Sequence, residues 1–107
     1  VLSGKYRNGN MPENSRLKLF SNLARFSNSK CFEATELYYN IAAKHNLSLA
    51  EMSLAFVNDR PFVTSNIIGA TSMGQLEENI NSINIKLSKE ILSEIKSVSE
   101  KIPNPAP

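Results

Sequence analysis

The feature that most constrains the fold is a short apolar run that ends at a glycine and leads directly into a capped helix. The run covers residues 62–68, is rich in β-branched side chains, and closes at Gly69, so it predicts a strand. Three residues later, Ser72 and Gln75 have the spacing of a capping box, which specifies the start of the helix. Helix, strand and helix in this order indicate α/β architecture, where ligands bind beyond the carboxyl ends of the strands.

The same junction has the form of an anion site. A helix N-terminus offers unpaired backbone N–H groups and the positive end of the helix dipole. Gly69 would let the main chain approach a ligand that a β-carbon would hold off. Residues 69–74 lack the lysine and the spacing of a P-loop, so the pattern leaves open both a phosphate site and an ordinary strand-to-helix turn.

Composition predicts an ordinary globular protein. The 107 residues are 41% hydrophobic and 21% charged, and the net charge of +2 is spread without a basic block, which gives no case for nucleic acid or membrane as a partner. No apolar run approaches the ~20 residues of a membrane span, and no signal peptide is visible. The single cysteine, Cys31, excludes an internal disulfide, so we expect a cytoplasmic protein.

Two features predict that the chain is a piece of something larger. It begins VLSGK with no initiator methionine, and its one convincing strand has nothing to pair with. Residues 7–31 are predicted to be mostly a polar surface loop, with weak helical character over 17–26, and residues 102–107 an extended tail. Helices are predicted over 32–45, 48–59, 72–84 and 88–101, each with one apolar face turned inward. These faces consist, in the same order, of Leu37, Ile41 and Ala42; of Leu49, Met52, Ala55 and Phe56; of Met73, Leu76, Ile80 and Ile83; and of Ile91, Leu92, Ile95 and Val98.

No catalytic constellation is evident in these residues. His45, the only histidine, lies near a predicted helix C-terminus, where the dipole favours a partly cationic imidazole, and no partner motif accompanies it. Cys31 has no His or Cys companion at metal spacing, so no metal site is expected. Tyr6, Tyr38 and Tyr39 could each donate a proton, but helix-face packing is the stronger interpretation for the last two.

Polar residues near the glycine junction could surround a ligand. Gln75, Glu78 and Asn79 share one side of the helix, one turn beyond its start. Lys5 and Arg16 flank the long loop, where they are either surface charges or, if they converge on one phosphate, a clamp. Spacing alone does not choose between a solvated helix face and a binding site.

Three segments carry a resemblance to a known family. They are residues 2–6, residues 12–16, and residues 68–79, which contain G-A-[ST]-x-x-x-Q-L-x-E-N; the Pro-Ala-Pro ending adds to them. The chain resembles, over essentially its whole length, the C-terminal third of an aldo-keto reductase of the Tas-like and potassium-channel β-subunit branch. The resemblance implies part of a (β/α)₈ TIM barrel of roughly 250 residues or more, with residues 1–5 ending the seventh strand, 63–68 forming the eighth, and 88–101 a late accessory helix.

The resemblance also implies NADPH-dependent reduction of small-molecule aldehydes and ketones by hydride transfer, with this segment gripping the cofactor. The implied cofactor-binding residues are Leu2, Ser3, Gly4 and Lys5 over the pyrophosphate, Ser15 and Arg16 on the adenosine side, Gly69 and Thr71 at the 2′-phosphate, and Gln75, Glu78 and Asn79 at the adenine and ribose. The loop is one residue longer here than in the β-subunits and has Asn14 at a position where an aromatic residue can occur. Both departures affect the assignment of Arg16 to the adenosine side, which depends on the alignment of this loop.

The catalytic Asp, Tyr, Lys and His of the family belong to the first half of its barrel, so no catalytic residue is assigned in this chain. The carbonyl substrate and the oligomeric state stay open. Two alternatives remain: a nucleotide-sensing protein like the β-subunits, and a free-standing helical interaction module without catalysis. The module predicts a cooperative fold for the 107 residues alone, whereas a barrel arc predicts poor autonomous stability because its strand edges are unpaired and one helix face is uncovered.

Overall fold

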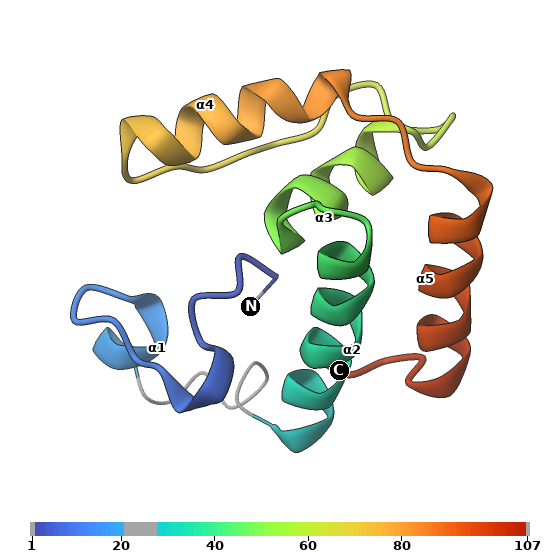
Figure 1. Cartoon of the computed structure of the whole chain (residues 1–107). Helices are drawn as coiled ribbons and strands as arrows, with labels where there is room; N and C mark the ends of the chain where they lie inside the picture. The colour runs from blue at the N-terminus through green and yellow to red at the C-terminus, as the bar shows by residue number, and fades with distance from the viewer. Residues whose placement is uncertain (1, 21–27, 107) are drawn as a thin grey trace.

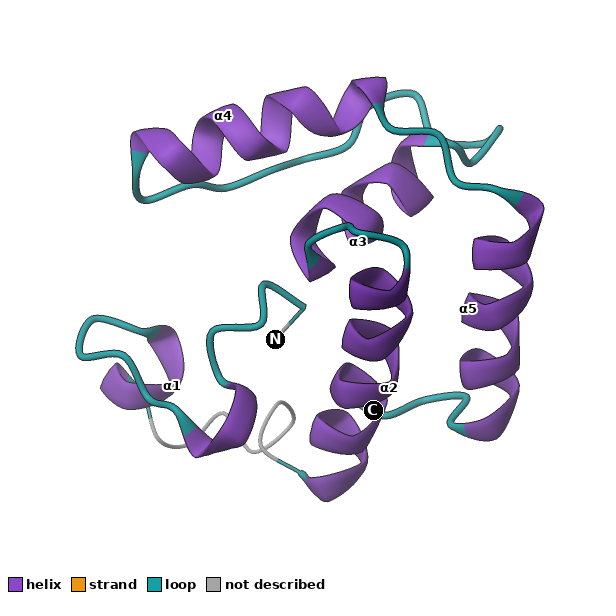
Figure 2. Ribbon diagram, in the orientation of Figure 1, coloured by secondary structure: helices purple, strands orange, loops and turns teal. Residues whose placement is uncertain are grey.

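The computed structural model describes residues 2–20 and 28–106, and every regular element in them is helical (Figures 1 and 2). Helices α2 and α5 lie side by side and run in opposite directions, α3 follows α2 closely, and α4 lies across the end of this group (Figure 1). In chain order the elements are η1 (Arg7–Gly9), α1 (Arg16–Leu19), α2 (Ser29–Lys44), α3 (Leu49–Asn58), α4 (Met73–Asn81), η3 (Ser82–Asn84) and α5 (Lys89–Lys101).

The core lies where α2, α3 and α5 meet. Met52 of α3 is only 2% exposed, and Ala42 of α2 is fully buried. Burial of this cluster confirms most of the inward faces predicted for these three helices, because apolar side chains three and four residues apart face one neighbour. The exception is Leu92, which is only half-buried and lies outside the cluster. Its buried members are Ile41, Ala42, Leu49, Met52, Ile91, Ile95 and Val98, with Leu37, Tyr38, Tyr39 and Phe56 packed against them.

Side-chain caps fix where the helices begin. The Ser48 hydroxyl accepts the Glu51 N–H at 3.0 Å while the Glu51 carboxylate accepts the Ser48 N–H at 2.9 Å, so the predicted capping box is complete. Ser88 caps α5 as predicted. Asn28 accepts the Cys31 N–H at 2.9 Å and starts α2 three residues earlier than the prediction, which had assigned these residues to the loop.

The two predicted strands are absent from the described part of the chain. Residues 2–6 form turns, with Gly4 at φ +81°, and residues 65–70 run without backbone pairing beside α4 (Figure 1). A strand forms only where a neighbour satisfies its N–H and C=O groups, and the described residues supply none. The described residues therefore form no strand by themselves, while their mostly helical character is confirmed; Val1 lies outside the described residues.

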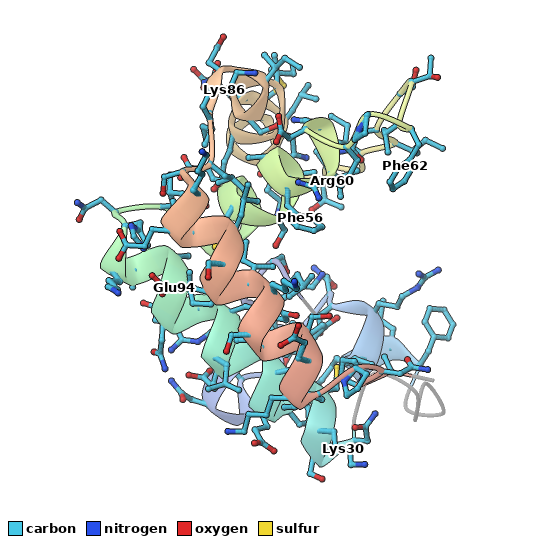
Figure 3. The ribbon with its side chains drawn as sticks, turned by 90° about the vertical axis from the view of Figure 1, so that its right-hand side faces the viewer. Lys30, Phe56, Arg60, Phe62, Lys86 and Glu94 are labelled. Carbon is cyan, nitrogen blue, oxygen red and sulfur yellow. The ribbon has the colours of Figure 1, made fainter. Side chains whose placement is uncertain are left out.

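The apolar stripe predicted to face inward on α4 is uncovered by the described residues. Met73 is 78% exposed, and Ile80 and Ile83 are also exposed. Phe62 and Ile67, from the predicted strand, are exposed as well, and Phe62 projects away from the helices (Figure 3). Only Leu76 of the four predicted inward residues is half-buried, and Ile83 lies in η3 rather than in α4. The inward face predicted for this helix is therefore not confirmed, because no described layer covers it.

The described loop and tail are ordered by a few contacts. The long loop contains η1 and α1, and residues 21–27, which include most of the predicted weak helix, lie outside the described residues. The Asn28 amide donates to the Pro105 carbonyl at 2.8 Å and ties the tail to the start of α2, and Ile102 is buried. None of the described helices is long and apolar enough to cross a bilayer.

Hydrogen exchange on the 107-residue chain should separate two regions. Amides of α2, α3 and α5 should be protected because these helices share the buried core, whereas amides of α4 should exchange much faster because its apolar face is exposed. Exchange followed by mass spectrometry of peptic fragments measures this directly. Equal protection of α4 and α2 would contradict the prediction and favour a free-standing module.

Candidate functional site

A cavity of about 310 Å³ lies between residues 2–6, which we call the N-terminal turn, and the start of α4. It unites residues from three separate parts of the sequence, and seven of the eleven predicted cofactor residues line it. The lining consists of Ser3, Lys5, Ala50, Gly69, Ala70, Thr71, Gln75, Glu78 and Asn79.

The turn before α4 is braced by side chains of the helix that follows it. Ser72 accepts the Gln75 N–H at 3.2 Å, as a capping residue should. The Gln75 side-chain oxygen does not complete the predicted capping box; it accepts from the Thr71 N–H at 2.9 Å and from the Thr71 hydroxyl at 3.1 Å. The Asn79 amide donates to the Gly69 carbonyl at 3.2 Å, so the turn is held at both ends.

Gly69 lies on the cavity wall in a conformation open to any residue. Its φ is not in the left-handed region, and a β-carbon built there would meet no atom within 4 Å. Gly74 has the same open surroundings. Neither backbone strain nor packing within the described chain therefore requires a glycine at position 69.

Glu78 links α4 to α3. The Ser48 hydroxyl donates a short hydrogen bond to Glu78 Oε1 while it also caps α3. The carboxylate predicted to meet the ribose thus already has a protein partner. Ala50, in the first turn of α3, is brought to the cavity beside it. Tertiary packing places Ala50 there, and an alanine gives no signal in the sequence.

Lys5 places a positive charge on the cavity wall. Its ammonium lies 5.3 Å from the centre of the Tyr6 ring and pairs with no carboxylate among the described residues. Tyr6 is buried, and its hydroxyl accepts the Leu17 N–H at 3.2 Å. Burial raises the pKa of Tyr6, but the hydrogen bond from the Leu17 N–H, the nearby Ser15 hydroxyl and the charge of Lys5 together outweigh it, and the pKa is lowered.

Four predicted cofactor residues do not line this cavity. Leu2 borders two apolar cavities beside Tyr38. Gly4 takes a positive φ within the N-terminal turn. Ser15 is buried at the start of α1 without a side-chain cap hydrogen bond, and Arg16 is exposed on α1 without an ion pair to a described residue. The structure therefore does not bring Ser15 and Arg16 to the other predicted residues.

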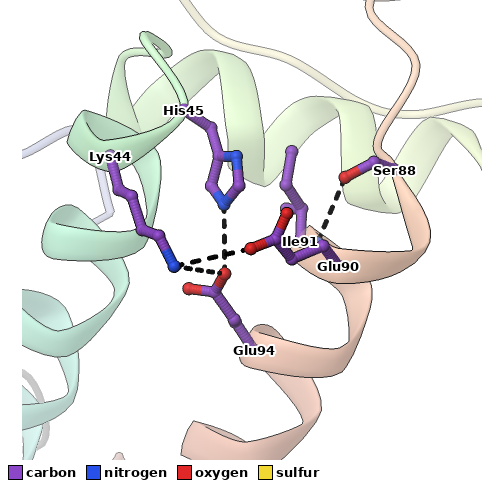
Figure 4. A network of polar contacts seen from close by, with 6 residues as sticks. All are labelled: Lys44, His45, Ser88, Glu90, Ile91 and Glu94. Atoms are coloured by element: carbon purple, nitrogen blue, oxygen red, sulfur yellow. Dashed lines mark hydrogen bonds and ion pairs between the residues drawn. The ribbon is translucent and has the colours of Figure 1, made fainter.

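A second polar group joins the end of α2 to α5 (Figure 4). His45 caps the C-terminus of α2, as predicted, and its Nε2 lies 3.1 Å from Glu94 Oε1. Ligand atoms of His45, Glu90 and Glu94 lie within 4.8 Å of one another, but the Lys44 ammonium lies 3.1 Å from Glu94 and 3.6 Å from Glu90. Because the lysine already supplies the cation, the group is an ion-pair network.

Acid should weaken the contact between α2 and α5. Hydrogen bonds from His45 and then Lys44 hold the pKa of Glu94 below its ordinary value of 4.5. A lowered folded-state pKa contributes stability that is present above the unfolded value and is lost as pH falls through the folded one. We expect Glu94→Gln to lower the melting temperature at pH 7 and to flatten its fall below about pH 4.5.

Thermal unfolding followed by circular dichroism between about pH 3 and pH 7 measures this. Glu100→Gln is the matched control, because Glu100 is exposed and lies 3.9 Å from Lys96 in a single pair. Equal acid dependence in the wild-type chain and Glu94→Gln would show that Glu94 does not carry the effect.

Comparison with known proteins places these residues in a family context. The sequence model of the aldo/keto reductase family matches residues 1–100. Protein tas of Escherichia coli strain K12 is 44% identical over 107 residues, which are 100% of this chain and 31% of that protein. A protein of Oryza sativa subsp. japonica named as a probable voltage-gated potassium channel subunit beta is 33% identical over 109 residues, covering 96% of this chain and 33% of the relative.

A third relative is an L-glyceraldehyde 3-phosphate reductase of Escherichia coli O157:H7. It is 34% identical over 101 residues, which are 89% of this chain and 29% of that protein. The chain therefore spans about a third of the length of the curated relatives it matches.

Proposed function

The chain belongs to the aldo/keto reductase family. We propose that it forms the part of an NADPH-dependent reductase of aldehydes and ketones that binds the adenosine and phosphate groups of the cofactor. Family membership and the name of the glyceraldehyde-phosphate reductase support oxidoreductase chemistry in general. The observation that carries the proposal is the convergence of seven predicted cofactor residues on one cavity.

The chemistry of the cavity wall suits a phosphate ester. Lys5 brings a cation with no carboxylate partner among the described residues, and the N-terminus of α4 adds the positive end of a dipole. Ser3 and Thr71 contribute hydroxyl groups to the same wall. Close approach of a ligand to the backbone gives a physical reason for Gly69, which the fold of the described chain does not require.

The size of the cavity suits part of a dinucleotide. At about 310 Å³ it lies at the small end of the range for ligand cavities, which begins near ~300 Å³. An adenosine bearing a phosphate is of this scale, whereas a whole dinucleotide needs more wall than these residues supply. The nicotinamide half would therefore lie against other parts of the protein.

In the proposed reaction this chain binds and orients the cofactor and performs no proton transfer. Bound NADPH supplies the hydride that reduces a carbonyl carbon. Lys5 and the turn at residues 69–71 would fix the phosphate, and Gln75 and Asn79, which already hold that turn, would limit its movement. Proton donation belongs to catalytic residues outside this chain.

We further propose that the whole protein is a cytoplasmic TIM barrel of which this chain is the C-terminal part. Residues 63–68 would become the eighth strand once neighbouring strands pair with them, and the barrel would cover the exposed stripe of α4. A nucleotide-sensing role is the second candidate, supported by the relative named as a potassium channel subunit beta.

Loss of the charge at position 5 should discriminate between the two forms of the cofactor. The cavity brings Lys5 together with Gly69 and Thr71, the residues implied at the 2′-phosphate, and not only with the residues implied at the pyrophosphate. In the native gene product, Lys5→Ala should therefore weaken NADPH binding about tenfold and NADH binding much less, because only NADPH carries the additional 2′-phosphate. Arg16→Ala should have a smaller effect than Lys5→Ala, since α1 holds Arg16 away from the cavity.

Dissociation constants from fluorescence titration of both cofactors provide the measurement. Lys96→Ala, which removes an exposed lysine on α5, is the matched control and should change neither constant. Equal weakening of NADPH and NADH by Lys5→Ala would rule out recognition of the 2′-phosphate by this lysine.

A further inference from the structure

We propose that Arg7 is a positioning residue that fixes the N-terminal turn, and with it Lys5, against the cavity; this inference rests on the proposed function. Arg7 is not among the residues that line the cavity. It lies two residues beyond Lys5, and its N–H donates to the Gly4 carbonyl at 3.2 Å. Whatever holds Arg7 therefore holds the turn that presents Lys5.

Helix α2 holds Arg7 by two different contacts. The guanidinium forms a forked ion pair with Glu36, with Nε 2.7 Å from Oε1 and Nη2 3.1 Å from Oε2. The same group lies 3.2 Å from the centre of the Tyr39 ring, a stacked cation–π contact. Glu36 and Tyr39 are three residues apart on α2, so they present one face to the guanidinium.

The electrostatics agree with this geometry. The hydrogen bond to Arg7 lowers the pKa of Glu36, and the hydrogen bond to Glu36 raises the pKa of Arg7. Both groups therefore stay ionised over the whole neutral range, and the contact does not switch with pH.

The turn needs such an anchor because its own backbone is unusual. Gly4, Asn8 and Gly9 all have positive φ, at +81°, 57° and +75°, and Asn8 is not a glycine. A β-carbon at Gly9 would meet nothing within 4 Å, so the space around that position is open. Short turns with positive φ lose much conformational entropy on ordering. Fixing the turn before the cofactor arrives removes that cost from binding.

The proposal can be tested by combining variants at positions 5 and 7 in the native gene product. Arg7→Ala should weaken NADPH about five- to tenfold, the scale of one forked ion pair with a stacked ring. The loss caused by Lys5→Ala should shrink in the Arg7→Ala background, because the lysine is no longer held in place. Arg7→Lys should recover only part of the affinity, since an ammonium cannot reproduce the fork.

Arg60 provides the matched control. It has the same kinds of partner, with its guanidinium 4.3 Å from the Phe56 ring centre and 3.7 Å from Asp59, at the end of α3 and outside the cavity lining (Figure 3). Arg60→Ala should leave NADPH affinity unchanged. If Arg7→Ala does not fold, Glu36→Gln breaks the same ion pair from the other side and carries the same expectation.

Hydrogen exchange without cofactor gives a readout independent of binding. In Arg7→Ala, amides of residues 2–10 should exchange faster while those of α5 stay unchanged. Additive losses for Arg7→Ala and Lys5→Ala, or unchanged affinity in Arg7→Ala, would overturn the positioning role while the proposed function stands. No binding of NADPH by the wild-type protein would overturn both.

Discussion

The burial of one apolar cluster between α2, α3 and α5 is the constraint on which the rest of the structure depends. Met52 and Ala42 lie at its centre, and α5 closes it from the C-terminal side. Each part of the candidate site is then attached to this unit by polar contacts: the N-terminal turn through Arg7 to α2, and α4 through Glu78 to the start of α3. The cavity lies between these two attached parts.

The attachment of α4 leaves its apolar side chains exposed. The Asn58 amide at the end of α3 donates to the Ser82 hydroxyl of η3 at 3.1 Å, and the Asn66 amide, in the segment before α4, donates to Asn58 Oδ1 at 3.1 Å. The apolar stripe of α4 stays exposed. Individual hydrogen bonds contribute about 1 kcal/mol each, whereas burial of an aliphatic side chain contributes ~1.5–3 kcal/mol. Burial of this stripe against the rest of the proposed barrel would therefore stabilise the cavity more than these hydrogen bonds do.

The sequence predicted the helices well because their signals are local. Apolar spacing and caps at Ser48 and Ser88 depend on residues within one or two turns, and the structure confirms them. The strand predicted at residues 63–68 does not form in the described chain, because a strand needs a neighbouring strand to pair with and no local pattern supplies one. The early start of α2 was missed because Asn28 was assigned to the loop.

The lining of the cavity could be predicted in part for the same reason. Helical spacing places Gln75 and Asn79 on one side of their helix, as predicted. Spacing does not predict that Gln75 accepts from Thr71 or that Ser48 donates to Glu78, because these hydrogen bonds depend on which groups the folded chain brings close together. Only the resemblance to the family predicted that Lys5 and Thr71 belong to the same site, because their spacing in the sequence does not connect them. The anchoring role of Arg7 depends on its distance to Glu36, twenty-nine residues away in sequence.

The intact mass of the native gene product, captured with an antibody raised against residues 89–101, tests most directly whether this chain is part of a larger barrel. The alignment covers 31% of protein tas, so we predict a product roughly three times as long as this chain, the size of a complete barrel. A product of 107 residues would contradict the central claim, because a chain of that length is too short to form the proposed barrel.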